Sequence, residues 1–77
     1  MDSKLTFRYD RDTDILYIDK VLPYQEQESE EVGDGLVARL NPDTGDVENL
    51  EVLFFSSRLN EGDFFEIPVT ADLHLVG

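Results

Sequence analysis

Asp10, Asp12 and Asp14 stand at every second position of a short polar segment, and this spacing matches the first three ligand positions of an EF-hand calcium loop. The rest of that loop is missing. Its sixth position, where a sharp turn requires glycine, is Ile15, and its twelfth position, where a glutamate should close the cage, is Val21. The segment therefore predicts a hairpin turn, with a weak divalent-cation site as the alternative.

Asp43-Thr44-Gly45 has the residue order of the catalytic triplet of aspartic proteases, in which two aspartates share one proton. A catalytic aspartate of that kind lies in a buried cleft. Here Asn41-Pro42 precedes the triplet and Asp46 follows it, and proline and glycine at these positions are typical of an exposed turn. We therefore predict a turn and not a protease site.

Nucleophilic catalysis requires a base beside a hydroxyl or thiol group. The chain has no cysteine and one histidine, His74, which alternation places on the polar face of a C-terminal strand. Ser56 and Ser57 fall in a predicted helical turn, where serine commonly bonds to the local backbone. A single histidine also cannot build the usual zinc cage within one chain. We predict no catalytic residue, no metal ligand, no cofactor and no enzymatic activity; an enzyme that uses carboxylates alone is the remaining enzymatic alternative.

The net charge of the chain limits the classes of molecule that we expect it to bind. Eighteen acidic residues against six basic ones give a formal net charge of −12. Such a surface repels nucleic-acid phosphates and anionic lipids, so we expect neither nucleic acid nor membrane as a partner. A basic protein or a divalent cation would be attracted, although the same charge also keeps a protein soluble. No apolar run reaches the roughly 18 residues that span a bilayer, and Met1–Lys4 lacks a secretion signal, so we predict a cytoplasmic protein.

Short runs in which apolar and polar residues alternate predict β-strands, because this is the period of a half-buried strand. Gly33-Asp34-Gly35 and the segment 41–45 supply turn residues between the runs. Val47 is out of phase with Leu50, which indicates a bulge or a change of face within one strand. The predicted strands cover residues 5–9, 15–18, 36–40, 46–53 and 64–76.

Other segments give less regular patterns. Residues 15–18 are apolar throughout, so we place that strand at the centre of the sheet with cover on both sides. Residues 21–31 form either an exposed edge strand or a loop, and the glutamates at 26, 28, 30 and 31 suit an edge that must not pair with other proteins. Phe54–Leu59, which ends at Asn60-Glu61-Gly62, predicts a single helical turn.

We therefore predict one domain over residues 1–77, of the α+β class but mostly β, with about five antiparallel strands and one short helical turn. A domain of this length buries only about 60% of the surface of its unfolded chain, which favours association. The predicted core consists of Leu5, Phe7, Ile15, Leu16, Tyr17, Ile18, Leu36, Leu40, Leu50, Val52, Phe54, Ile67, Val69 and Leu73.

The last run, from Phe65 to Leu75, is the most regular alternation in the sequence. Pro68 cannot donate a ladder hydrogen bond, so this strand should lie at a sheet edge or carry a bulge. Its six apolar residues share one face, and nothing after it would cover them. We predict a homodimer in which residues 65–76 contribute to the interface, with burial against the chain's own sheet as the alternative.

Several blocks occur in a recognisable order: Tyr9–Ile18, Glu28–Val32, Asp34–Leu36, Asp43–Val47 and Leu50–Leu53. In this order the chain resembles the small prokaryotic proteins grouped as domain of unknown function 2283 (DUF2283), over about residues 5–59. The resemblance implies a compact β-rich fold with a short helix. It implies no activity and no catalytic or binding residue, since the family has none established. Some members are similar to the smaller, acidic half of toxin–antitoxin gene pairs.

The function is not determined by these patterns, and three hypotheses follow from them. The first is a protein–protein interaction module that binds a basic protein through its acidic surface, as an antitoxin-like neutraliser of a small basic enzyme would. The second is a weak divalent-cation-binding protein that uses the aspartate hairpin. The third is the carboxylate-based enzyme.

Overall fold

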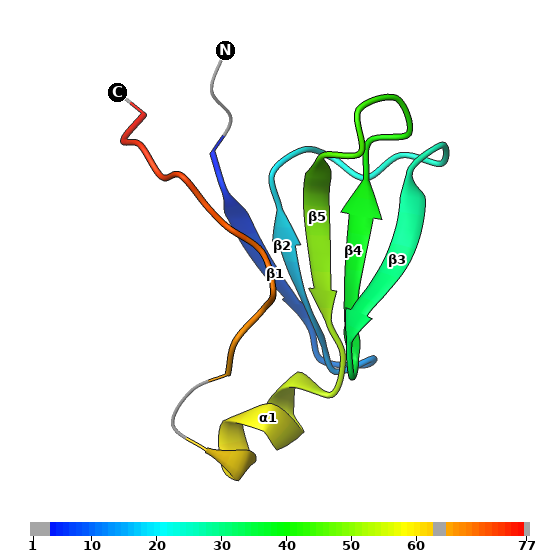
Figure 1. Ribbon diagram of the computed structural model, residues 1–77. Coiled ribbons are helices and arrows are strands. Elements are labelled where there is room, and N and C mark those ends of the chain that lie inside the picture. The colour runs from blue at the N-terminus through cyan, green and yellow to red at the C-terminus, as the bar shows by residue number, and fades with distance from the viewer. Residues whose placement is uncertain (1–3, 63–64, 77) are drawn as a thin grey trace.

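Five antiparallel strands form one sheet, and one short helix follows them in the computed structural model, which describes residues 4–62 and 65–76 (Figure 1). The predicted fold class is confirmed. Across the sheet the order is β1-β2-β5-β4-β3. The elements are β1 (Thr6–Asp10), β2 (Ile15–Asp19), β3 (Glu28–Gly33), β4 (Leu36–Leu40), β5 (Val47–Val52) and α1 (Phe55–Glu61). In the described part of the chain, no helix has the length and apolar character needed to cross a membrane.

Turn residues fix the connections between neighbouring strands. Gly35 and Gly45 have φ angles of 71° and 77°, so each adopts the left-handed conformation that glycine allows at little cost. The predicted irregularity at Val47 is a bulge: Arg39 of β4 lies opposite Asn49, whereas the next residue, Leu40, lies opposite Val47. Glu48 is therefore the extra residue of β5.

The register of the strands divides the sheet into two faces. Leu16 of β2 and Leu36 of β4 both lie opposite Val52 of β5, and residues directly opposite one another share a face. We call this side the apolar face; its members are Phe7, Tyr9, Leu16, Ile18, Leu36, Ala38, Leu40, Leu50 and Val52. The polar face, on the other side, carries Arg8, Tyr17, Asp19, Val37, Arg39, Asn49 and Glu51.

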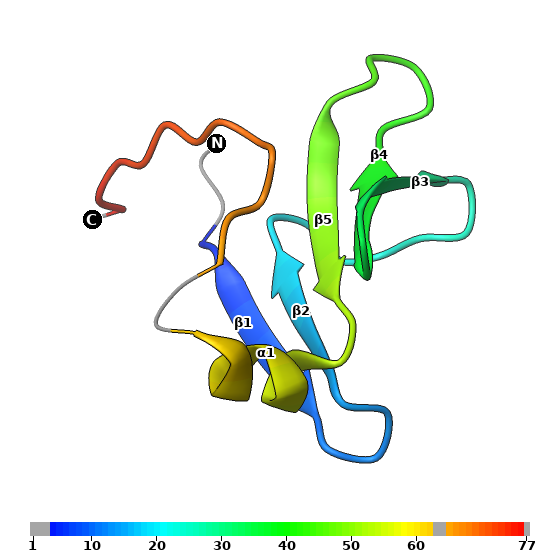
Figure 2. The ribbon, with the colours of Figure 1, turned by 60° about the horizontal axis from the view of Figure 1, so that its bottom comes forward.

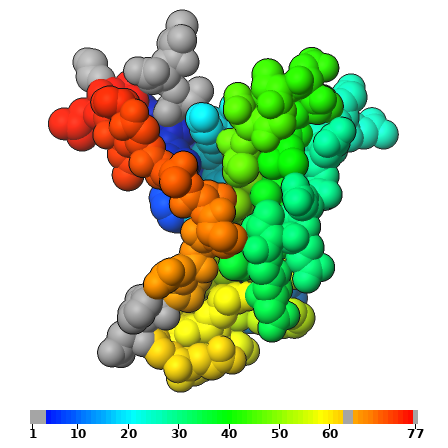
Figure 3. Space-filling model, in the orientation of Figure 1, coloured from blue at the N-terminus to red at the C-terminus, as the bar shows by residue number. Residues whose placement is uncertain are grey.

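Helix α1 and residues 65–76 lie on the apolar side of the sheet. The Phe55 ring of α1 packs 5.7 Å from the Tyr9 ring, and Phe65 packs edge-on at 6.2 Å from Phe55. In the space-filling view, residues 65–76 cross in front of the sheet while β3 and β4 remain visible beside them (Figure 3). The cover of the apolar face is therefore partial.

The core is smaller than predicted. Leu36 and Val52 are buried as expected, and Ala38, which was not predicted as core, has 0% exposure. The prediction was wrong for Leu5, Phe7, Phe54 and Leu73, whose exposed fractions are 46%, 62%, 67% and 75%. The other predicted core residues are half-buried, because alternation identifies the face of a residue but not whether that face is covered.

The predicted C-terminal strand is also wrong over the described residues 65–76, which form no strand; Phe64 lies outside the described residues. The backbone bends at Pro68, and the Val69 N–H donates to the Ile67 carbonyl at 2.7 Å. Such a tight turn breaks an extended ladder, and proline could not donate to one.

Two further expectations are settled by the strand order. The uncertain segment 21–31 is a loop up to Gln27, followed by β3, whose outer side forms an edge of the sheet. β2 lies inside the sheet between β1 and β5, as expected of an apolar run, but β5 and not β2 is the middle strand.

Substituting Val52 tests the importance of the small core. Val52→Ala removes two methyl groups from a side chain with 0% exposure, and we expect it to lower the free energy of unfolding by about 2 kcal/mol. Leu75→Ala, at a position with 101% exposure, is the control and should change it by less than about 0.5 kcal/mol. Equal urea-unfolding midpoints for the two variants would contradict this description of the core.

Candidate functional site

Asp14 joins the β1–β2 hairpin to the start of helix α1. Its Oδ1 accepts hydrogen bonds from the Tyr9 hydroxyl at 2.6 Å and from the Ser56 N–H at 3.0 Å, and its Oδ2 accepts one from the Ser56 hydroxyl at 2.7 Å. The Asp14 carbonyl accepts a further bond from the Phe55 N–H at 3.0 Å. Phe54, the N-cap residue, offers no side-chain acceptor, so Asp14 caps the helix from 42 residues away.

These contacts shift the acidities of both partners. The Tyr9 hydroxyl, followed by the Ser56 donors, holds the pKa of Asp14 below its ordinary value, and the same carboxylate raises the pKa of Tyr9. Asp10 faces another way: its Oδ1 accepts the Asp12 N–H at 3.0 Å within the hairpin turn. The three aspartates therefore do not converge. Among the described residues, no group of three or more His, Cys, Asp or Glu side chains could hold a metal ion.

A second polar cluster lies at the opposite end of the sheet and includes the buried polar residues Asp19, Gln27 and Asn49. The Asn49 amide donates to Asp19 Oδ1 at 2.9 Å and to the Val21 carbonyl at 2.6 Å. Gln27 donates its own amide to Asn49 Oδ1 at 2.7 Å. Since burial of unpaired polar groups is costly, these bonds fix loop 20–27 against the polar face.

Glu48, the bulge residue, extends this cluster. Its carboxylate accepts bonds from the Tyr24 hydroxyl at 2.6 Å, from the Gln27 amide at 3.1 Å and from the Asn41 amide at 3.3 Å. The contact with Glu48 raises the pKa of Tyr24 to about 12, while Tyr24 and Gln27 lower the pKa of Glu48. The cluster therefore positions Gln27, the residue directly before β3. Sequence reasoning missed this cluster, because its hydrogen bonds join residues far apart in the sequence; the local signal was an uncharged amide, Asn49, within a predicted strand.

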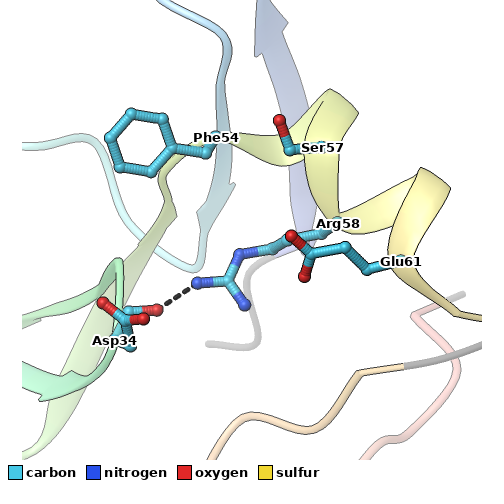
Figure 4. A pocket seen from close by; sticks show the side chains of 5 residues that line it. All are labelled: Asp34, Phe54, Ser57, Arg58 and Glu61. Atoms are coloured by element: carbon cyan, nitrogen blue, oxygen red, sulfur yellow. Dashed lines mark hydrogen bonds between the residues drawn. The ribbon is translucent and has the colours of Figure 1, made fainter.

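A shallow hollow of about 310 Å³ lies beside helix α1 and is lined by Asp34, Phe54, Ser57, Arg58 and Glu61 (Figure 4). Arg58 is committed to structure here: its Nε donates to the Leu53 carbonyl at 3.1 Å, and its Nη2 donates to the Asp34 carbonyl. The Ser57 hydroxyl has no hydrogen bond to a base among the described residues. The hollow thus lacks an arrangement suited to nucleophilic catalysis.

The other residues considered for catalysis lie apart from one another. Asp43 is exposed in the turn, where its N–H donates to Asn41 Oδ1 at 2.8 Å. His74 is exposed, with Nε2 3.2 Å from Asp72 Oδ1. The Ser56 hydroxyl donates a hydrogen bond to Asp14 as part of the helix cap. Asp43, His74 and Ser56 are therefore not brought to one another, and the one contact of Ser56 with another sequence candidate in the described part of the chain is the helix cap at Asp14.

The two edges of the sheet remain as candidate binding surfaces. In the described part of the chain, β1 pairs only with β2 and β3 pairs only with β4, so the outer N–H and C=O groups of both edge strands can accept another strand. Their side chains differ. β3 exposes Glu28, Glu30 and Glu31, whereas β1 exposes the rings of Phe7 and Tyr9.

Comparison with known protein families identifies a match over the sheet. The family model described as "Protein of unknown function (DUF2283)" matches residues 6–56, from the start of β1 into helix α1. No curated protein and no solved structure matches the chain.

The lowered pKa of Asp14 predicts a pH dependence of stability. A carboxyl group whose pKa is lowered in the folded state stabilises the fold above its ordinary value, 3.8 here, and this stabilisation is lost as the pH falls through the folded-state pKa. Asp14→Asn should therefore lower the Tm at neutral pH, and the Tm difference from the wild type should disappear in acid, where a protonated aspartate resembles asparagine.

Asp12→Asn is the matched control, because it removes the same charge from the same turn without touching Ser56. Thermal unfolding monitored by circular dichroism between acid and neutral pH checks the expectation. An equal loss of Tm in both variants, or a loss for Asp14→Asn that persists in strong acid, would contradict the capping role.

Asn49 should be the most sensitive polar position of the loop cluster. Asn49→Ala leaves Asp19, Gln27 and the Val21 carbonyl without a shared partner, and we expect a loss of about 2–3 kcal/mol in unfolding free energy. Asn60→Ala, on the exposed surface of α1, should change it by less than about 0.5 kcal/mol. Urea titrations that place both variants at the wild-type midpoint would show that the cluster does not stabilise the fold.

Proposed function

The chain belongs to the DUF2283 family of proteins of unknown function, and from this premise we propose that it is a protein–protein interaction module whose acidic edge strand β3 binds a basic, extended segment of another protein. The observation that carries the proposal is the combination on β3 of an unpaired outer edge with exposed Glu28, Glu30 and Glu31. The module acts in the cytoplasm and without catalysis.

An open edge offers main-chain hydrogen bonds to any extended chain, and the side chains decide which chain is accepted. Glutamates along the edge repel an acidic strand and disfavour a neutral one, so they protect the edge from unspecific pairing. A strand with Lys or Arg at alternate positions would instead place its positive charges beside these glutamates. The glutamates of β3 lie on both faces of the sheet, since Glu30 lies opposite Ala38 of the apolar face and Glu31 lies opposite Val37 of the polar face.

Preorganisation of β3 also supports the proposal. Gln27, the residue before the strand, is buried and bonded to both Asn49 and Glu48. The edge is therefore held in an extended form before a partner arrives, which lowers the conformational entropy lost on binding. A small basic enzyme is the kind of partner that this surface fits, which would make the module antitoxin-like.

The test uses an alternating Lys–Val peptide as a probe and follows the backbone amide signals of the labelled protein by NMR. We expect the largest shifts along β3, with an affinity that falls as salt is raised, because added salt screens exposed charges. Glu28→Lys/Glu30→Lys should abolish binding. Asp43→Lys/Asp46→Lys makes the same charge change in the 41–46 turn and should leave most of the binding in place.

Three outcomes would overturn the proposal. The first is no binding of the basic peptide at low salt. The second is binding that is indifferent to salt. The third is an equal loss of binding in the two double variants, which would mean that the net charge and not the β3 edge attracts the peptide.

A further inference from the structure

We propose that two copies of the chain pair through the other edge of the sheet. β1 of each copy runs antiparallel to β1 of the other, and the two Phe7 residues lie directly opposite each other across the two-fold axis. The result is one continuous sheet with five strands from each copy. This inference goes beyond the proposed function, because it concerns β1 and leaves β3 open for a partner.

The surface of β1 differs from that of a protected edge. Leu5, Phe7 and Tyr9 have exposed fractions of 46%, 62% and 45%, although they lie on the apolar side of the sheet. β1 is the outermost strand in both ribbon views and pairs only with β2 in the described part of the chain (Figures 1 and 2). An apolar edge strand without protecting charges on that face is a template for another strand.

Symmetry restricts the register of such a pairing. In an antiparallel pair, residues directly opposite one another lie on the same face, and a two-fold axis through the pair must keep each residue on its own face. Opposed residues must therefore both have odd or both have even numbers. The axis then passes between the two copies of one β1 residue. The residues near the middle of the paired segment that could take this position are Thr6, Phe7 and Arg8.

Charge selects among these three registers. An axis through Arg8 places two guanidinium groups opposite each other, and an axis through Thr6 places Lys4 opposite Arg8 of the second copy. Like charges at directly opposed positions destabilise a pair of strands.

The Phe7 register instead places Lys4 opposite Asp10 of the second copy, so that opposite charges face each other. On the apolar face, Leu5 meets Tyr9 of the second copy and the two Phe7 rings meet at the axis. Pairing over residues 4–10 would form about six inter-chain backbone hydrogen bonds.

The distribution of charge along the chain weakens, near β1, the repulsion that a net charge of −12 imposes on two copies. Residues 4–20, which form the β1–β2 hairpin, contain four basic residues and four acidic ones, and their net charge is therefore zero. The basic residues are Lys4, Arg8, Arg11 and Lys20, and the acidic ones are Asp10, Asp12, Asp14 and Asp19. The excess negative charge lies elsewhere in the chain.

Pairing through β1 also keeps the acidic edges apart, because each β3 lies at the far edge of its own sheet. With strands about 4.8 Å apart, the two β3 edges would be separated by about 40 Å, several times the Debye length of about 8 Å at physiological salt.

Single cysteines give a test of the register, because the chain contains none of its own. Thr6→Cys, Phe7→Cys and Arg8→Cys proteins are each treated with a short bifunctional thiol reagent, and the covalent dimer is quantified. We expect fast cross-linking of Phe7→Cys alone, slow cross-linking of Thr6→Cys or Arg8→Cys alone, and fast cross-linking when those two are mixed. The fastest cross-linking at position 6 or 8 alone would overturn the proposed register.

The mass in solution tests whether the pairing occurs at all. We expect the wild type to sediment as a dimer at micromolar concentration and Phe7→Glu as a folded monomer, because two glutamates would then meet on the axis. Leu75→Glu makes the same change at a fully exposed position outside β1 and should remain dimeric. A monomeric wild type, a dimeric Phe7→Glu protein, or open-ended polymers that indicate pairing of β1 with β3 would each refute the proposal.

Discussion

The carboxylate of Asp14 is the contact on which the arrangement of the helix depends. The hydrogen bonds of a sheet hold strands together, but they do not determine where a helix after the last strand goes. Asp14 determines this by accepting both donors of Ser56 while it is itself held by Tyr9. Phe55 is thereby brought to the apolar face, where it packs against Tyr9 and then against Phe65. The Asp14 carboxylate and its neutral donors thus place the start of helix α1 beside the apolar face, and the segment after the helix continues over that face.

Strand positions were predictable because they depend on local sequence patterns: β1 and β4 show a period of two, β2 is a continuous apolar run, and β5 alternates on both sides of its bulge. The same reasoning failed at residues 65–76, where the alternation is the most regular of all. A strand also needs a neighbour, and a sequence period contains no information about whether an edge is available. Pro68 bends the segment away from a ladder, so its apolar residues lie against the sheet, or beside it, without pairing.

The two polar clusters escaped prediction for a different reason, which is that their hydrogen bonds join residues far apart in the sequence. Asn49 bonds to Gln27 and Asp19, which are 22 and 30 residues away, and Asp14 bonds to Ser56 across 42 residues. Such contacts depend on the strand order β1-β2-β5-β4-β3, in which β5 lies between two strands that precede it in the chain. The aspartate spacing of the hairpin suggested a cation loop, whereas the fold uses Asp14 for a distant helix and Asp10 for the local turn.

In the proposed pair of copies, the two edges of the sheet have different roles. Only Leu36, Ala38 and Val52 are buried apolar residues in the described part of the chain, so the hydrophobic contribution to folding is small for a domain of 77 residues. The proposed pairing through β1 would add hydrophobic burial at the edge where charge repulsion is weakest. Negative charge placed on the opposite edge then ends the growth of the sheet, because two acidic edges repel each other. Once β1 pairs with β1, both free edges of the proposed pair are acidic, and the sheet would not grow further through them.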